Sequence, residues 1–145
     1  METWWKYVVD GVAAIGGLIA GLYGGWPGIM TVLVVFMVAD YVLGCACALT
    51  GKSTKTEGGG FLSRVAFMGL LKKAAIMLVV LLAVYLDKAT GSTSTVFQSA
   101  AVFFYIANEG MSILENCALL GVPVPDTLRN ALEVLKSKSE KDDSE

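Results

Sequence analysis

Residues 11–39 read GVAAIGGLIAGLYGGWPGIMTVLVVFMVA, and none of these side chains carries a charge. A helix of about 20 apolar residues crosses the hydrocarbon core of a bilayer, so this run is longer than one crossing needs. The apolar pattern extends from Tyr7 to Thr50, which as helix is roughly 66 Å, or about two bilayer thicknesses. The chain must therefore fold back within this stretch, and the protein is predicted to be an integral membrane protein.

The reversal is predicted at Gly24–Gly25–Trp26–Pro27–Gly28. Proline removes a helical N–H donor, and glycine allows the backbone conformations that reverse a chain. This break divides the stretch into helices at about 6–24 and about 28–50. The first apolar run continues well beyond signal-peptide length, so it is interpreted as a retained membrane helix.

The composition fits a membrane protein and argues against an enzyme. The chain has 145 residues, a mean hydropathy of +0.65 and only 17% charged residues, whereas soluble domains carry about 25%. Histidine is absent, which removes the commonest general base and metal ligand. Cys45, Cys47 and Cys117 match no zinc or disulfide spacing. We therefore expect no catalytic residue, no metal and no cofactor. No basic cluster indicates nucleic acid as a partner.

Two further helices are predicted at about 66–86 and about 96–120. The first of them crosses a membrane only if Lys72 and Lys73 reach the membrane interface with their long side chains. Pro123 and Pro125 end the other. The predicted fold is an all-α membrane protein with about four transmembrane helices in residues 1–121. Residues 122–145 form a cytoplasmic region with a charged tail and a short amphipathic helix, whose apolar stripe is Leu128, Ala131, Leu132 and Leu135.

Basic residues predict the orientation of these helices. With four crossings and both termini in the cytoplasm, Lys88 is the only one of the 11 Lys and Arg residues in an outside loop. Cytoplasmic loops carry an excess of Lys and Arg, so the distribution favours this topology. A three-span alternative, with one segment lying in the membrane interface, stays open.

The predicted helix at 96–120 carries a polar stripe along one side. Ionisable groups at membrane depth usually face a bundle interior or a watery cavity, so the stripe is a candidate for pore lining or oligomer contact. A polar face in water on an interfacial helix, or one satisfied within a packed monomer, would give the same pattern. The candidate residues are Asn108, Glu109, Ser112, Glu115 and Asn116, with Gln98 and Tyr105 on the same side.

Asp40 is a second candidate for the same role, because it lies within an apolar helix. Its carboxylate could pair with Lys72 or Lys73, bond to Asn108, or be protonated. Gly17, Gly21 and Gly25 recur at every fourth position, a spacing that lets membrane helices approach closely. Packing within one monomer and packing between subunits both fit this glycine pattern.

Several of these motifs together resemble the phage holin family, also called the toxin secretion/phage lysis holins. The resemblance covers about residues 38–135 and rests on polar marks in order: ADYVLG at 39–44, GLLKK at 69–73, NEGMSILEN at 108–116 and GVPVP at 121–125. It implies a small multi-pass protein of the bacterial cytoplasmic membrane. Such proteins assemble as homo-oligomers in the lipid bilayer and open lesions that release an endolysin or a secreted toxin.

The resemblance assigns no defined role to single residues. Asp40, Lys72, Lys73, Asn108, Glu109, Ser112, Glu115 and Asn116 occupy its motif positions and are its candidates. Two other classes of protein remain open on the residues alone. One is a small ion channel or transporter subunit, and the other is an antiholin-like regulatory protein that binds a pore former.

Overall fold

The computed structural model describes residues 2–91 and 93–142, and every regular element in them is a helix. This confirms the predicted all-α class. The elements are α1 (Glu2–Leu22), α2 (Gly28–Leu49), the single-turn 3-10 helix η1 (Glu57–Gly59), α3 (Ser63–Ala89), α4 (Val96–Leu119) and α5 (Asp126–Asp142). The predicted helix at about 66–86 is longer than expected at both ends, because Arg64 and Lys88 extend it with exposed polar turns.

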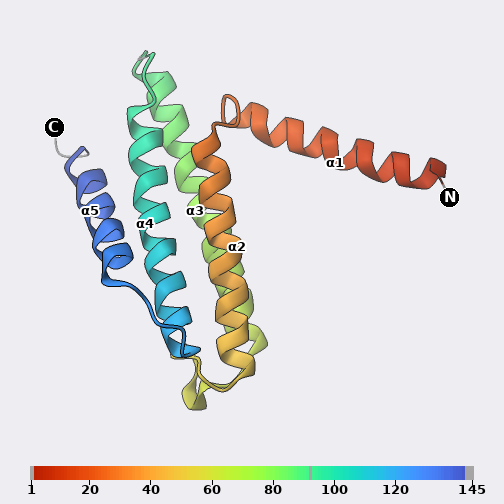
Figure 1. Cartoon of the computed structure of the whole chain (residues 1–145). Coiled ribbons are helices and arrows are strands. Elements are labelled where there is room, and N and C mark those ends of the chain that lie inside the picture. Colours follow the sequence, from red (N-terminus) through yellow and green to blue (C-terminus); the bar gives the residue numbers. More distant parts are fainter. Residues whose placement is uncertain (1, 92, 143–145) are drawn as a thin grey trace.

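Helices α2, α3 and α4 stand side by side and form a bundle in which the chain runs down, up and down (Figure 1). Met30, Leu33, Val80 and Val102 have no exposed surface and form the centre of its core. They come from all three helices, so the apolar face of each helix is buried against the other two.

The outer faces of the bundle remain apolar. Val35, Val38 and Val42 of α2 are more than half exposed, as are Leu78 and Leu82 of α3. Soluble monomers rarely expose apolar surface on this scale, whereas lipid covers such a surface without cost. The outward faces of α2 and α3 are those of a membrane protein.

Helix α1 lies apart from the bundle (Figure 1), and its apolar window is 0% buried. It ends at Leu22 rather than at about 24, because Gly24 and Gly25 have φ values of +72° and +117° that only glycine adopts readily. Gly25 therefore belongs to the turn. A Cβ added at Gly17 or Gly21 would meet nothing within 4 Å in the described residues. Packing of this glycine stripe against another copy stays a prediction.

The prediction of four membrane spans is wrong by the criteria of length and composition. Three helices in the described part of the chain are long and apolar enough to cross a membrane: Thr3–Leu22, Gly28–Leu49 and Ser63–Ala89. Helix α4 has the length, but Gln98, Asn108, Glu109, Glu115 and Asn116 lower its hydropathy. It is nevertheless part of the bundle, because it packs against both α2 and α3.

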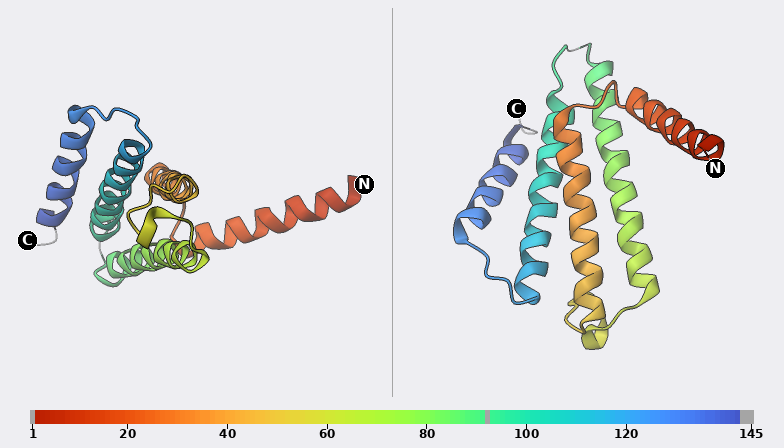
Figure 2. Two further views of the ribbon diagram at one scale, coloured as in Figure 1. Left: turned by 90° about the horizontal axis from the view of Figure 1, so that it is seen from below. Right: turned by 45° about the vertical axis from the view of Figure 1, so that its right-hand side comes forward.

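Helix α5 packs along α4 on the side away from α2 and α3 (Figure 2). A Cβ at Gly110 would meet both terminal methyl groups of Leu132 at 2.9 Å, so the glycine provides the notch that holds α5. Leu135 packs against the bundle core. Half of the predicted apolar stripe of this helix makes the contact, since Leu128 and Ala131 are exposed.

Candidate functional site

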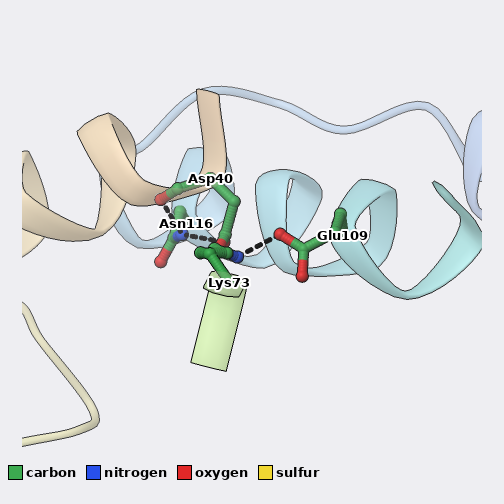
Figure 3. Close-up of polar contacts among 4 residues, drawn as sticks. All are labelled: Asp40, Lys73, Glu109 and Asn116. Carbon is green, nitrogen blue, oxygen red and sulfur yellow. Dashed lines mark hydrogen bonds and ion pairs between the residues drawn. The ribbon is translucent and has the colours of Figure 1, made fainter. Parts of the chain in front are cut away.

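Four polar side chains from three helices meet inside the bundle (Figure 3). The Lys73 ammonium donates to Asp40 Oδ2 at 2.5 Å and also pairs with the Glu109 carboxylate. Asn116 Nδ2 donates to Asp40 Oδ1 at 3.0 Å and to the Asp40 carbonyl oxygen at 3.4 Å. These four residues are called the charge cluster below.

Helix geometry brings the charge cluster to one level. Asp40, Lys73 and Glu109 each lie nine or ten residues, or roughly 15 Å, from the end of their helix at the same end of the bundle. Glu109 and Asn116 are seven residues apart, so both face the bundle from neighbouring positions on α4. Cys47 lies at the corresponding position after Asp40, and its thiol donates to the Asn116 carbonyl at 3.5 Å.

The charge cluster is buried and holds one cation against two carboxylates. The side chains of Asp40 and Glu109 are 6% and 4% exposed, and that of Lys73 is 15% exposed. Buried charges are tolerated when they are paired and hydrogen-bonded, and loss of one partner leaves an uncompensated charge. Lys73 of α3 therefore links α2 to α4, because the carboxylates of these two helices share its one ammonium group.

A cavity of about 310 Å³ leads to the charge cluster from the segment that joins α2 to α3. Ser53, Lys55, Thr56 and Phe61 of that segment line its outer part. Asp40, Lys73, Glu109, Asn108 and Ser112 line its inner part. The cavity connects the charges with one end of the bundle.

The structure divides the predicted polar stripe of α4. Glu109 and Asn116 point into the bundle and join the charge cluster, while Asn108 and Glu115 are exposed. Ser112 is half-buried at the cavity. Within one monomer, therefore, the polar groups on only one side of the stripe, those of Glu109 and Asn116, have partners in the charge cluster. Asn108, which lines the cavity, and Glu115 are exposed to solvent and stay candidates for oligomer contact or pore lining.

The alternatives left open for Asp40 are narrowed by the same geometry. Its cation is Lys73, and the amide that bonds to it is Asn116 rather than Asn108. Lys72 is exposed and lines the cavity. Lys73 turns inward to the carboxylates, whereas Lys72 does not. The membrane-interface position of these two lysines stays a prediction.

One capping interaction had no signal that could be recognised in the sequence. The Asp87 carboxylate at the end of α3 accepts bonds from the backbone N–H groups of Phe97 at 3.0 Å and Gln98 at 2.8 Å. It therefore caps the N-terminus of α4 from another helix, which sets the register of α3 against α4. The nearest local N-cap residue, Thr95, makes no side-chain cap bond.

Helices α1, α2 and α3 are long and apolar enough to cross a membrane, and a charge cluster is buried between α2, α3 and α4. These features define the class as a small multi-pass membrane protein. Within this class, the chain belongs to the bacteriophage holin family, whose model matches residues 17–137. Holins are membrane pore-forming proteins without enzymatic activity, so membership agrees with the expectation that the chain is not an enzyme.

Relatives from two bacteria and one bacteriophage cover between 79% and 99% of the chain. An uncharacterized 14.9 kDa protein of Clostridium perfringens is 37% identical over 95% of this chain and 99% of its own. An uncharacterized protein of Listeria monocytogenes is 36% identical over 99% of this chain and 94% of its own. A protein of Bacillus phage phi105 named "Probable holin" is 35% identical over 79% of this chain and 82% of its own. No solved structure matches the chain.

Proposed function

We propose that this protein is a phage-type holin that forms homo-oligomeric lesions in the bacterial cytoplasmic membrane and so releases a cell-wall hydrolase or a toxin. The observation that carries the proposal is the family match across residues 17–137. The similarity to a phage protein named as a holin supports it. The functional partner is an endolysin or a secreted toxin, which needs a passage through the membrane and no direct contact with the holin.

The charge cluster suits a protein that accumulates harmlessly before it acts. In one copy, Lys73 pairs with both Asp40 and Glu109, so each carboxylate already has a partner within the monomer. Asn108 and Glu115 are exposed on α4 and remain costly in lipid. Association of copies at high density removes that cost by covering these side chains with protein or water.

The proposed location is the cytoplasmic membrane, with the segment between α2 and α3 on the cytoplasmic side. That segment and the nearby start of α3 carry Lys52, Lys55 and Arg64. The opposite end of the bundle carries Lys88 and, where α5 packs beside the start of α4, also Lys138. An excess of Lys and Arg marks cytoplasmic loops. The cytoplasmic position of both termini was predicted with four crossings, and for the N-terminus it stays a prediction. The end of α5, packed along α4, lies instead at the Lys88 end of the bundle (Figure 1).

Inducible expression in a bacterium tests the function, with and without a co-expressed cytoplasmic muralytic enzyme, by following culture turbidity. We expect abrupt lysis only when both proteins are present, because the enzyme needs the lesion to reach the cell wall. Loss of membrane potential without lysis would contradict the holin and favour a channel. No effect of expression would also contradict it and favour an antiholin-like regulator.

One observation favours an ion channel or transporter subunit as the second candidate. The cavity places Asp40 and Glu109 at the inner end of a path that starts at one end of the bundle. Ionisable side chains at membrane depth are typical of ion pathways. Such a protein would pass ions and retain folded proteins, so the size of what crosses the membrane separates the two candidates.

A further inference from the structure

Helix α5 joins a polar surface to the bundle. Its inner side is held by Leu132 at the Gly110 notch, by Leu135 at the core, and by the Lys136 ammonium 5.7 Å from the centre of the Phe104 ring. Ser139, farther along this side, is only 4% exposed. The contact is therefore a packed interface that continues along most of the helix.

The outer side of α5 is mainly polar, although Leu128 and Val134 are also about half exposed. The exposed polar residues of this helix are Asp126, Thr127, Asn130, Glu133, Ser137, Lys138, Glu140 and Lys141. Charged side chains against lipid tails are expensive. A bundle that carries α5 on α4 therefore needs water, not lipid, on that side.

The opposite side of the molecule needs lipid. Helices α2 and α3 expose Val38, Val42, Leu78 and Leu82, and α4 lies between them and α5 (Figure 2). The protein thus has one side suited to hydrocarbon and another suited to water. A single copy within a bilayer cannot satisfy both sides, but copies arranged around water can.

We propose that α5, packed on α4, forms the water-facing wall of the lesion. In this assembly α2 and α3 face lipid, and the outer side of α5 faces the aqueous opening. The inference rests on the proposed holin function and deepens it, because it names the lining and assigns it to a segment other than the polar stripe of α4.

The dimensions of α5 fit this role. Its 17 residues extend over roughly 25 Å, most of the thickness of a hydrocarbon core. The extended segment 120–125, with Pro123 and Pro125, runs back along α4 before α5 begins (Figure 1). Together the segment and the helix follow α4 over nearly its whole length.

A covalent tether tests whether α5 stays on α4 in the open lesion. Cys45, Cys47 and Cys117 are free thiols, so they are first replaced by Ala. Phe104→Cys and Lys136→Cys are then joined by a short thiol cross-linker, and the full chain is reconstituted in vesicles that contain a dye. We expect the tethered protein to release dye at least as fast as the untethered one. The proposal would be overturned if a reducible cross-linker stopped dye release and reduction of the cross-linker restored it.

Charge reversal on α5 tests whether it lines the water. Vesicles release an anionic and a cationic dye of equal size at about 10 mM salt, where charges act over roughly 30 Å. We expect Glu133→Lys with Glu140→Lys to raise the anion-to-cation release ratio about twofold or more. The matched control, Glu57→Lys in η1, should leave the ratio unchanged.

The outcomes separate this inference from the function on which it rests. Suppose that the unaltered protein releases dye, but the anion-to-cation ratio does not change on reversal of the α5 charges, or changes equally with Glu57→Lys. Either result overturns the proposed lining by α5 and leaves the holin function intact. No release by the unaltered protein overturns the lesion itself, and the lining with it.

Discussion

At the scale of single residues, Lys73 of α3 is the cation that pairs with carboxylates of both neighbouring helices. Its ammonium lies between Asp40 of α2 and Glu109 of α4, and the three groups have little contact with solvent. Two carboxylates in a low-dielectric interior repel each other strongly when no cation separates them. The stability of the bundle should therefore depend on this lysine and hardly at all on its neighbour, Lys72.

Lys73→Met should destabilise the bundle by about 3–5 kcal/mol, because it leaves two buried carboxylates without their cation. Lys72→Met, an equal change at an exposed position, should alter stability by about 0.5 kcal/mol or less. Denaturant unfolding of both variants in detergent micelles, followed by circular dichroism, measures the difference. Equal effects of the two substitutions would show that the charge cluster does not hold the helices together.

Tyr23 ties the turn before α2 to the middle of α3, because its hydroxyl donates to the Met77 carbonyl at 2.7 Å. Burial raises the pKa of this phenol above its ordinary value of about 10. The stabilisation is complete below pH 10 and is lost as the pH rises through the higher pKa of the folded state. We expect Tyr23→Phe to cost about 0.5–1.5 kcal/mol near neutral pH and to remove this alkaline dependence. The measurement is the free energy of unfolding from pH 7 to pH 12 for both proteins. The same pH dependence in Tyr23→Phe and in the unaltered protein would contradict a role of this bond.

The sequence identifies the members of the charge cluster better than their partners. Asp40, Glu109 and Asn116 stand out because each is polar within an apolar helix. Their pairing depends on the axial position of α3 relative to α2 and α4. The periodicity of a single helix gives no information on that relative position. The sequence therefore left Lys72, Lys73 and Asn108 as equal partners for Asp40, and packing selected Lys73 and Asn116.

At the scale of helices, contacts between elements set where each helix begins and what it covers. Helix α4 starts where the Asp87 carboxylate of α3 meets its first free N–H groups. Helix α5 is held where Gly110 of α4 lacks a side chain. Neither contact joins residues that are close in sequence. The helices themselves could therefore be predicted from the sequence, but these contacts between helices could not.

Asp87→Ala should destabilise the α3–α4 junction by about 0.5–2 kcal/mol through loss of the cap. Asp87→Asn should cost less, since an amide oxygen still accepts a bond from a helix N-terminus. Amide hydrogen exchange of residues 96–99 reports on the junction directly. The control is Asp10→Ala on the exposed face of α1. If this control accelerated the exchange of residues 96–99 as much as Asp87→Ala does, the capping role would be contradicted.

Gly110→Ala should loosen α5 from α4, because the added methyl group would lie 2.9 Å from Leu132 and 3.3 Å from Phe36. Gly69→Ala is the matched control, since its added methyl group meets Tyr41 at an ordinary 3.6 Å. Alanine is otherwise the better helix former at both positions, by about 1 kcal/mol. We expect faster trypsin cleavage after Lys136 and Lys138 in the first variant only. Equal cleavage in both variants would mean that the notch does not hold α5.

At the scale of the whole molecule, the protein is divided into a lipid-facing side and a polar side. Composition and long apolar runs predicted the membrane character. The predicted break at Gly24–Gly28 does separate the first two helices, although α1 spans Glu2–Leu22 rather than about 6–24. The count of spans failed because α4 has the length of a span and the composition of a helix that needs protein or water beside it. The position of α5 could not be predicted, since its apolar stripe fits a membrane surface as well as it fits α4.

The measurement that tests the central claim most directly is the release of a folded protein from vesicles. Purified full-length chain is added to vesicles that contain both an ion-sized dye and a folded muralytic enzyme, and the two are measured outside over time. The holin account predicts that dye and active enzyme appear together once the protein exceeds a threshold density. Release of the dye while the enzyme stays inside at every density would contradict it and identify a channel for small ions.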